Sequence, residues 1–169
     1  MTDKSLEELI NQLRPRSRPT TMECVEQAGI DVSGWRTKKD GSECAIPAAN
    51  PHYCYEYCFG GDGEPKLFSI WHDRVEHRAG KLIVESQLRY HVEPAQTANH
   101  QRRRRARKFE AMMETAAATH EPIRVMLAAG TSSPALEQRV EKRALDPVNW
   151  TVVSFDGTTG KYRLERNSP

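Results

Sequence analysis

The sequence predicts a single α+β domain in which an antiparallel or mixed sheet packs against one long helix and several short helices. Three observations support this prediction. Apolar residues with helical spacing occur near the N-terminus and in one long central segment. Short segments with strand-like patterning, separated by turns, lie on both sides of that long helix. The length of 169 residues is that of one domain, and no internal repeat divides it.

The first predicted element is a short helix over residues 5–13. Ser5 and Glu8 have the spacing of a capping box, and leucine and isoleucine then recur at helical intervals. The next segment, Arg14–Thr20, contains two prolines and alternating arginines, which favour an extended connector. We therefore treat residues 1–20 as an N-terminal helix and a basic connector.

Residues 21–169 are predicted to form a single α+β module, which begins with a second short helix at about residues 22–28. Thr21 is the expected N-cap of this helix, and Gly29 is expected to end it. Residues 38–51 contain glycine, aspartate, serine and two prolines, which predicts a loop.

A region rich in predicted strands follows the loop. Tyrosine and phenylalanine alternate with cysteine and glutamate over Tyr53–Phe59, which predicts a strand with its aromatic side chains on one face. After a turn at Gly60–Pro65, a second strand is predicted over Lys66–His72. Val75–Arg78 and Lys81–Leu88 have the pattern of a hairpin, so the whole region predicts an antiparallel meander.

The remaining elements surround the long helix, which is predicted over Thr97–Thr119 because its apolar residues keep helical spacing. An apolar run over Pro122–Ala128 predicts a buried strand, and a serine followed by proline predicts a helix over Ser133–Ala144. The chain is then expected to close with a hairpin formed by Trp150–Phe155 and Lys161–Glu165.

Charge is distributed unevenly along the chain. The sequence carries 25 Lys and Arg residues and 23 Asp and Glu residues, a formal net charge of +2. Six of the positive charges form a basic stripe at the start of the long helix, and the 19 basic and 23 acidic residues that remain have a net charge of −4. The basic stripe consists of Arg102, Arg103, Arg104, Arg105, Arg107 and Lys108. Cations at a helix N-terminus oppose the macrodipole by about 0.3–1 kcal/mol each, which favours a polyanionic partner; the alternative is a solvated helix face.

DNA is the expected polyanion, and two groups of residues are candidates for contacting it. The basic stripe, with Arg16 and Arg18, would contact the phosphate backbone, which positions a protein on DNA without selecting a sequence. The aromatic segment would contact bases, by stacking or by accepting an extruded base. The candidate base-recognition residues are Asn50, Tyr53, Tyr55, Glu56, Trp71 and Asp73. The alternative is that the aromatic row forms half of a core, although each tyrosine hydroxyl would then need a partner.

No residue is predicted to be catalytic or to hold a metal ion or cofactor. Cys54 and Cys58 are the candidate zinc pair, but on a strand they would lie about 13 Å apart and could not bind one ion. Glu64 and Lys66 have the E-x-K spacing of metal-dependent nucleases, but Pro65 places them in a turn. The glycine motifs that bind phosphate and the G-x-S-x-G motif are absent from the sequence.

The sequence predicts a cytoplasmic protein without a membrane partner. No apolar run approaches the roughly 18–20 residues that span a bilayer, and the acidic N-terminus does not resemble a secretory signal. In the cytoplasm, the four cysteines are expected to be reduced thiols.

Four segments resemble the N-terminal module of bacterial HNH endonucleases of the modification-dependent restriction type. They are Thr21–Trp35, Ala49–Phe59, Leu67–Asp73 and Lys142–Arg166. The second segment contains N-P-H-Y-C-Y-E-Y where the family has N-P-x-Y-C-Y-E-W, so Tyr57 replaces a tryptophan. The resemblance implies a module that helps to select DNA beside a catalytic HNH domain. The four segments contain no HNH domain, so we expect either a stand-alone relative that works with a separate nuclease subunit or a fragment of a larger nuclease.

Two classes of function follow from these observations. The first is a non-catalytic DNA-binding module of restriction or defence, with modified bases as its target. The second is a protein-interaction or regulatory module, of anti-phage or phage origin, whose arginines bind the carboxylates of an acidic partner. A nuclease that depends on Glu56 and Glu64 is a third alternative.

Overall fold

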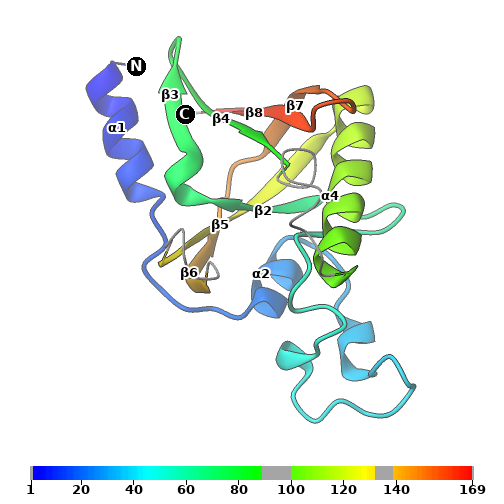
Figure 1. The fold of residues 1–169 in the computed structure, drawn as a ribbon. Coiled ribbons are helices and arrows are strands. Elements are labelled where there is room, and N and C mark those ends of the chain that lie inside the picture. The colour runs from blue at the N-terminus through cyan, green and yellow to red at the C-terminus, as the bar shows by residue number, and fades with distance from the viewer. Residues whose placement is uncertain (1, 89–99, 132–138, 169) are drawn as a thin grey trace.

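A mixed eight-stranded sheet forms the centre of the part of the chain that the structure describes, which is residues 2–88, 100–131 and 139–168 of a computed structural model (Figure 1). The strands are β1 (Cys58–Phe59), β2 (Leu67–Trp71), β3 (Val75–Arg78), β4 (Lys81–Gln87), β5 (Pro122–Thr131), β6 (Arg139–Leu145), β7 (Trp150–Phe155) and β8 (Lys161–Arg166). Their order is β1-β2-β5-β7-β8-β4-β3, and β6 pairs with β5. The predicted α+β class is confirmed.

Three α-helices in the described residues pack around this sheet. They are α1 (Asp3–Gln12), α2 (Thr21–Gln27) and α4 (His100–Thr119). The 3-10 turns η1 (Ser33–Arg36), η2 (Pro47–Ala49) and η3 (His72–Arg74) lie between the longer elements. The long helix is present as predicted, although its expected first residues, 97–99, lie outside the described residues.

The two N-terminal helices begin earlier than predicted, and both predicted caps are wrong. Thr2 caps α1, because its Oγ1 accepts a hydrogen bond from the backbone N–H of Ser5 at 3.2 Å. Thr20 caps α2 and forms a capping box with Glu23, whose carboxylate accepts a hydrogen bond from the Thr20 N–H at 2.6 Å. Each threonine has an extended backbone, which directs its side chain toward the third N–H of the helix.

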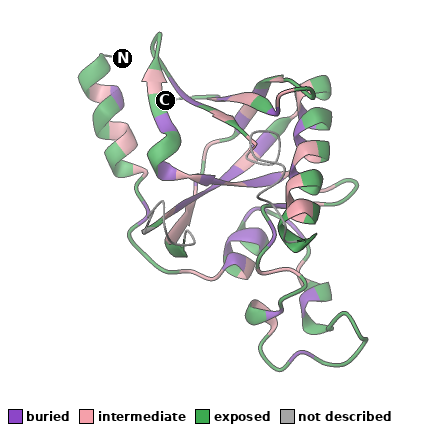
Figure 2. Cartoon of the chain, in the orientation of Figure 1, coloured by how far each residue is buried: buried purple, intermediate pink, exposed green. Residues whose placement is uncertain are grey.

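The buried residues form two hydrophobic clusters that use alternate residues of β2 and β5. Figure 2 shows how buried and exposed residues are distributed over the sheet and the helices. Phe68 and Val125 belong to the larger cluster, with Phe109 of α4. Leu67 and Met126 belong to the smaller cluster, which includes residues of α2. Because successive strand residues point to opposite faces, β2 and β5 are buried on both sides. Parallel strands usually have both faces covered, and β2 and β5 are indeed parallel, with Phe68 opposite Val125.

The predicted hairpins are present, but the meander is not. β3 pairs with β4 and β7 pairs with β8, in both cases antiparallel. β2 pairs with β5 rather than with β3, and β4 pairs with β8. The strand that the sequence predicts to precede a hairpin, β2, therefore lies between β1 and β5, and β5 comes after the long helix.

The predicted strand over Tyr53–Phe59 is wrong for most of its length. Only Cys58–Phe59 forms a strand, and the preceding residues form turns. The side chain of Asn50 explains the difference, because its Oδ1 accepts a hydrogen bond from the His52 N–H at 3.0 Å. The Asn50 carbonyl also accepts hydrogen bonds from the N–H groups of Tyr53 and Cys54. An asparagine side chain that accepts a hydrogen bond from the backbone N–H two residues further on favours a turn. Here this turn forms although the alternation of aromatic residues predicts a strand.

The helix predicted over Ser133–Ala144 is also wrong where it can be compared. Residues 132–138 lie outside the described residues, and Arg139–Leu145 forms β6. The register of the β5–β6 pairing shifts between Ala129 and Gly130. Gly130 allows the two backbones to approach closely, because a Cβ there would lie 1.8 Å from the Arg139 carbonyl oxygen. On its other side, β6 holds the N-terminal connector, since the Arg143 N–H donates to the Ser17 carbonyl at 3.3 Å. Pairing on both sides overrides the local helix signal.

Candidate nucleic-acid interface

The first half of α4 presents the basic stripe. The helix has no acidic residue before Glu110, and its first buried side chain is Phe109. Four members of the stripe are exposed and two are partly buried, so the stripe wraps around the helix and also faces water (Figure 2). The exposed members are Arg102, Arg104, Arg107 and Lys108, and the partly buried members are Arg103 and Arg105. The N-terminal end of a helix carries a partial positive charge, which adds to that of the side chains.

Glu56 joins the aromatic segment to the basic stripe. Its side chain is only 4% exposed, and its Oε1 accepts a hydrogen bond from Arg104 Nη2 at 2.5 Å. Its Oε2 lies 3.7 Å from Lys108 Nζ and has no hydrogen-bond partner among the described residues. The two candidate groups, which are far apart in the sequence, therefore meet through a buried carboxylate. Glu56 is occupied by this contact rather than directed at solvent.

Tyr55 lies at the surface, beside Arg105 of the basic stripe. Tyr55 is 59% exposed. The guanidinium carbon of Arg105 lies 5.3 Å from the centre of the Tyr55 ring. A cation at this distance interacts favourably with the ring. Tyr57 is 37% exposed, so two tyrosines of the segment reach the surface.

Tyr53 and Asn50 face inward instead. The ring of Tyr53 stacks on Trp35 with 5.2 Å between centroids, and Trp35 in turn stacks on Phe59 at 6.1 Å. The Asn50 side-chain amide is buried and donates hydrogen bonds to the carbonyls of Trp35 and Thr37, at 2.8 and 3.0 Å. The predicted single aromatic face is therefore wrong: Tyr53 and Phe59 are structural, while Tyr55 lies outside. The pattern gave no sign that Trp35 supplies the stacking partner.

The other predicted residues lie apart from this site. Trp71 ends β2, and Asp73 is in η3, which is held against α1 because His72 Nε2 hydrogen-bonds the Ile10 carbonyl at 2.7 Å. Figure 1 places α1 and α4 on opposite sides of the molecule. Arg16 and Arg18 are exposed on the connector between α1 and α2. The structure thus brings together Tyr55, Glu56 and the stripe, but not these four residues.

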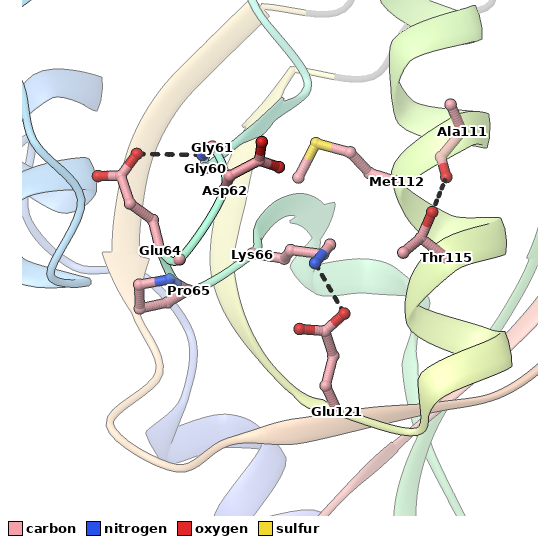
Figure 3. A pocket seen from close by; sticks show the side chains of 11 residues that line it. Gly60, Gly61, Asp62, Glu64, Pro65, Lys66, Ala111, Met112, Thr115 and Glu121 are labelled. Carbon is pink, nitrogen blue, oxygen red and sulfur yellow. Dashed lines mark hydrogen bonds and ion pairs between the residues drawn. The ribbon is translucent and has the colours of Figure 1, made fainter.

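A pocket of about 690 Å³ lies further along α4, between that helix and the glycine-rich turn (Figure 3). Glu64 and Lys66 line it, but both are occupied. The Glu64 carboxylate accepts hydrogen bonds from the N–H groups of Gly61 and Asp31, at 3.1 and 2.6 Å. Lys66 Nζ forms an ion pair with Glu121 at 2.7 Å, and this hydrogen bond lowers the pKa of the Glu121 carboxyl. The described residues contain no group of three His, Cys, Asp or Glu that could hold a metal ion.

The four thiols differ in accessibility, which predicts an order of reaction. All are free, and only Cys54 is partly exposed. Burial raises the pKa of Cys58 to about 12, and burial also raises the pKa of Cys54, though Arg105 opposes that rise. Because the thiolate reacts, we expect brief treatment with N-ethylmaleimide to modify Cys54 first. Peptide mass spectrometry checks this, with urea-unfolded protein as the control; faster modification of Cys58 in the folded protein would contradict the described packing.

No helix in the described ranges has both the length and the apolar character required to cross a membrane. Comparison of the chain with protein-family models, with curated proteins and with solved structures finds no match, so the resemblance to the HNH-associated module stays a prediction.

Proposed function

We propose that this chain is a non-catalytic DNA-binding module that contacts phosphates through the basic stripe. The observation that carries this proposal is the exposure of four stripe cations on the first half of α4. A restriction or defence role in the cytoplasm, beside a separate nuclease and with modified bases as target, belongs to the same proposal through the sequence resemblance.

The electrostatics favour a polyanion over a single anion. Without the stripe the chain is slightly acidic, with 19 basic and 23 acidic residues. The positive charge is therefore local and oriented, which is the arrangement that steers a charged partner to one face. Glu56 pairs with two members of the stripe, Arg104 and Lys108. A DNA backbone presents a row of phosphates to one face of a protein, whereas a single anion presents one charge.

The salt dependence of binding to a DNA duplex tests this proposal. Between four and six phosphate contacts give a slope of about −4 to −5 for log K against log salt concentration. We expect the variant R102Q/R103Q to bind more weakly and with a slope that is less steep by about 2. Fluorescence anisotropy with a labelled duplex of about 20 base pairs measures both quantities. Arg102 and Arg103 are chosen because Arg104 and Lys108 also hold Glu56.

The matched control is R78Q/K81Q, which removes two cations from the β3–β4 hairpin. Arg78 and Lys81 each pair with a glutamate at 3.0 Å, Glu85 and Glu165 respectively. The control variant is expected to bind like the wild type. Absence of binding at low salt, a flat salt response, or an equal loss in the control would contradict the proposal.

A second candidate function is binding of an acidic protein, and one observation favours it. Arg104 already binds a carboxylate, that of Glu56, which is the contact that an acidic peptide would offer. Pull-down with an acidic protein and competition with DNA distinguishes the two candidates. The second function would be supported if the wild-type chain binds an acidic protein but no DNA, and if R102Q/R103Q no longer binds that acidic protein.

A further inference from the structure

The inference concerns the form of DNA that the chain selects, and it rests on the DNA binding proposed above. We propose that the ring of Tyr55 stacks on an unpaired base beside the basic stripe, so that the preferred ligand is single-stranded DNA rather than a duplex.

Tyr55 is not needed to build the core, unlike the aromatic residues near it. Tyr53 and Phe59 both pack against Trp35, which is 3% exposed. Tyr55 is 59% exposed and is absent from both buried clusters and their packed neighbours. More than half of the Tyr55 surface stays in water, and a base stacked on the ring would remove more of its apolar surface from water.

The ring is also held in place before any ligand arrives. The next residue, Glu56, is buried and fixed to α4 through Arg104 and Lys108. Arg105 lies 5.3 Å from the ring centre, and its buried Nε has no hydrogen-bond partner among the described residues. The ring is therefore tethered beside the helix that carries the stripe, and less of its freedom is lost when a base binds.

An exposed ring beside a line of cations is the arrangement with which proteins bind single strands: the cations follow the phosphates and the ring accepts a base face. In a duplex, both faces of each internal base are covered by neighbouring pairs, so the ring would have nothing to stack on. The electrostatic contribution alone favours a duplex, since about 0.9 counterions are released per phosphate contact, against about 0.7 for a single strand. A preference for the single strand would therefore reveal contact with bases.

The test compares three ligands: an oligothymidylate of about 15 nucleotides, a duplex of the same length, and heparin, a polyanion without bases. We expect the wild-type chain to bind the oligothymidylate more tightly than the duplex, and tighter binding of the duplex would contradict the inference. Tyr55→Ala is expected to weaken oligothymidylate binding about tenfold and to leave duplex and heparin binding within about twofold. Tyr55→Phe, which keeps the ring, is expected to bind like the wild type. Val140→Ala, which trims a 37% exposed side chain on β6, is the matched control.

Two further results would overturn the inference. Unchanged oligothymidylate binding by Tyr55→Ala would show that no base stacks there. An equal loss for heparin would show that Tyr55 acts only by positioning the arginines. In both cases R102Q/R103Q would still lose binding, so the proposed phosphate contacts would stand. Absence of binding to all three ligands would instead overturn the proposed function together with this inference.

Discussion

Replacement of Asp146 by alanine is expected to lower the free energy of unfolding by about 3–5 kcal/mol. The carboxylate of Asp146 is fully buried and accepts two hydrogen bonds from Arg166, each at 2.8 Å. It also accepts the indole N–H of Trp150 at 2.8 Å and the backbone N–H of Val148 at 2.9 Å. The variant leaves a guanidinium, in a residue that is 7% exposed, without its counter-charge. Urea unfolding followed by circular dichroism measures the change.

Two further variants show whether the loss of stability in D146A comes from the unpaired charge that stays buried or from the loss of an ion pair. Glu85→Ala removes a carboxylate that pairs with Arg78 and Arg163 at 3.0 and 3.2 Å but is 40% exposed, and it is expected to cost less than about 1 kcal/mol. The double variant D146L/R166M removes both charges and is expected to be more stable than D146A, because no buried charge is left alone. A D146A protein within about 1 kcal/mol of the wild type would contradict this account.

Arg104→Gln is expected to destabilise the chain by about 2–3 kcal/mol, while Glu56→Gln costs less than about 1 kcal/mol. The two residues form one ion pair, but the Glu56 side chain is 4% exposed and that of Arg104 is 50% exposed. Without Arg104, the buried carboxylate of Glu56 keeps, among the described residues, only the Lys108 ammonium at 3.7 Å. Without the charge of Glu56, Arg104 can turn to water. Urea unfolding of the two variants measures this asymmetry.

Removal of the Glu56 charge is also expected to change DNA binding. Glu56→Gln releases Arg104 from its carboxylate, so we expect about threefold tighter binding and a slope against log salt that is steeper by up to about 0.9. Glu85→Gln, which makes the same change in net charge away from α4, is the matched control and is expected to have a smaller effect. Equal stability of the two single variants would contradict the burial argument, and unchanged binding by Glu56→Gln would show that Arg104 does not reach the DNA.

Local signals predicted the elements that depend on local interactions. The long helix and the hairpins β3–β4 and β7–β8 follow from apolar spacing and short turns, and they are present in the structure. The sequence of β6 predicts a helix, because the local signals do not reveal that this segment pairs with β5. The turn at Asn50 was missed because one side-chain hydrogen bond outweighs a period-two pattern.

The candidate site was predicted in its parts rather than in its arrangement. The basic stripe and Tyr55 were identified from charge and residue type, and Tyr55 and four of the six stripe residues are exposed. Their junction could not be predicted, because Glu56 and Arg104 are 48 positions apart in the chain. Glu56 was expected to contact a base edge, whereas it holds the segment to α4. Trp71 and Asp73 were grouped with the site as a second aromatic ring and a polar group near the aromatic segment in the sequence, but they lie at the end of β2 and in η3, away from α4.

The parallel pairing of β2 with β5 also bears on how the chain folds. Phe68 and Val125 are paired although β3, β4 and α4 all lie between them in the sequence. Closing such a long loop costs entropy before any contact compensates it, so domains built on distant pairings fold slowly. The hairpins and α4 can form early from nearby residues. The surface shared by Tyr55 and the stripe also joins distant segments, so we expect binding activity to develop only in the last stage of folding.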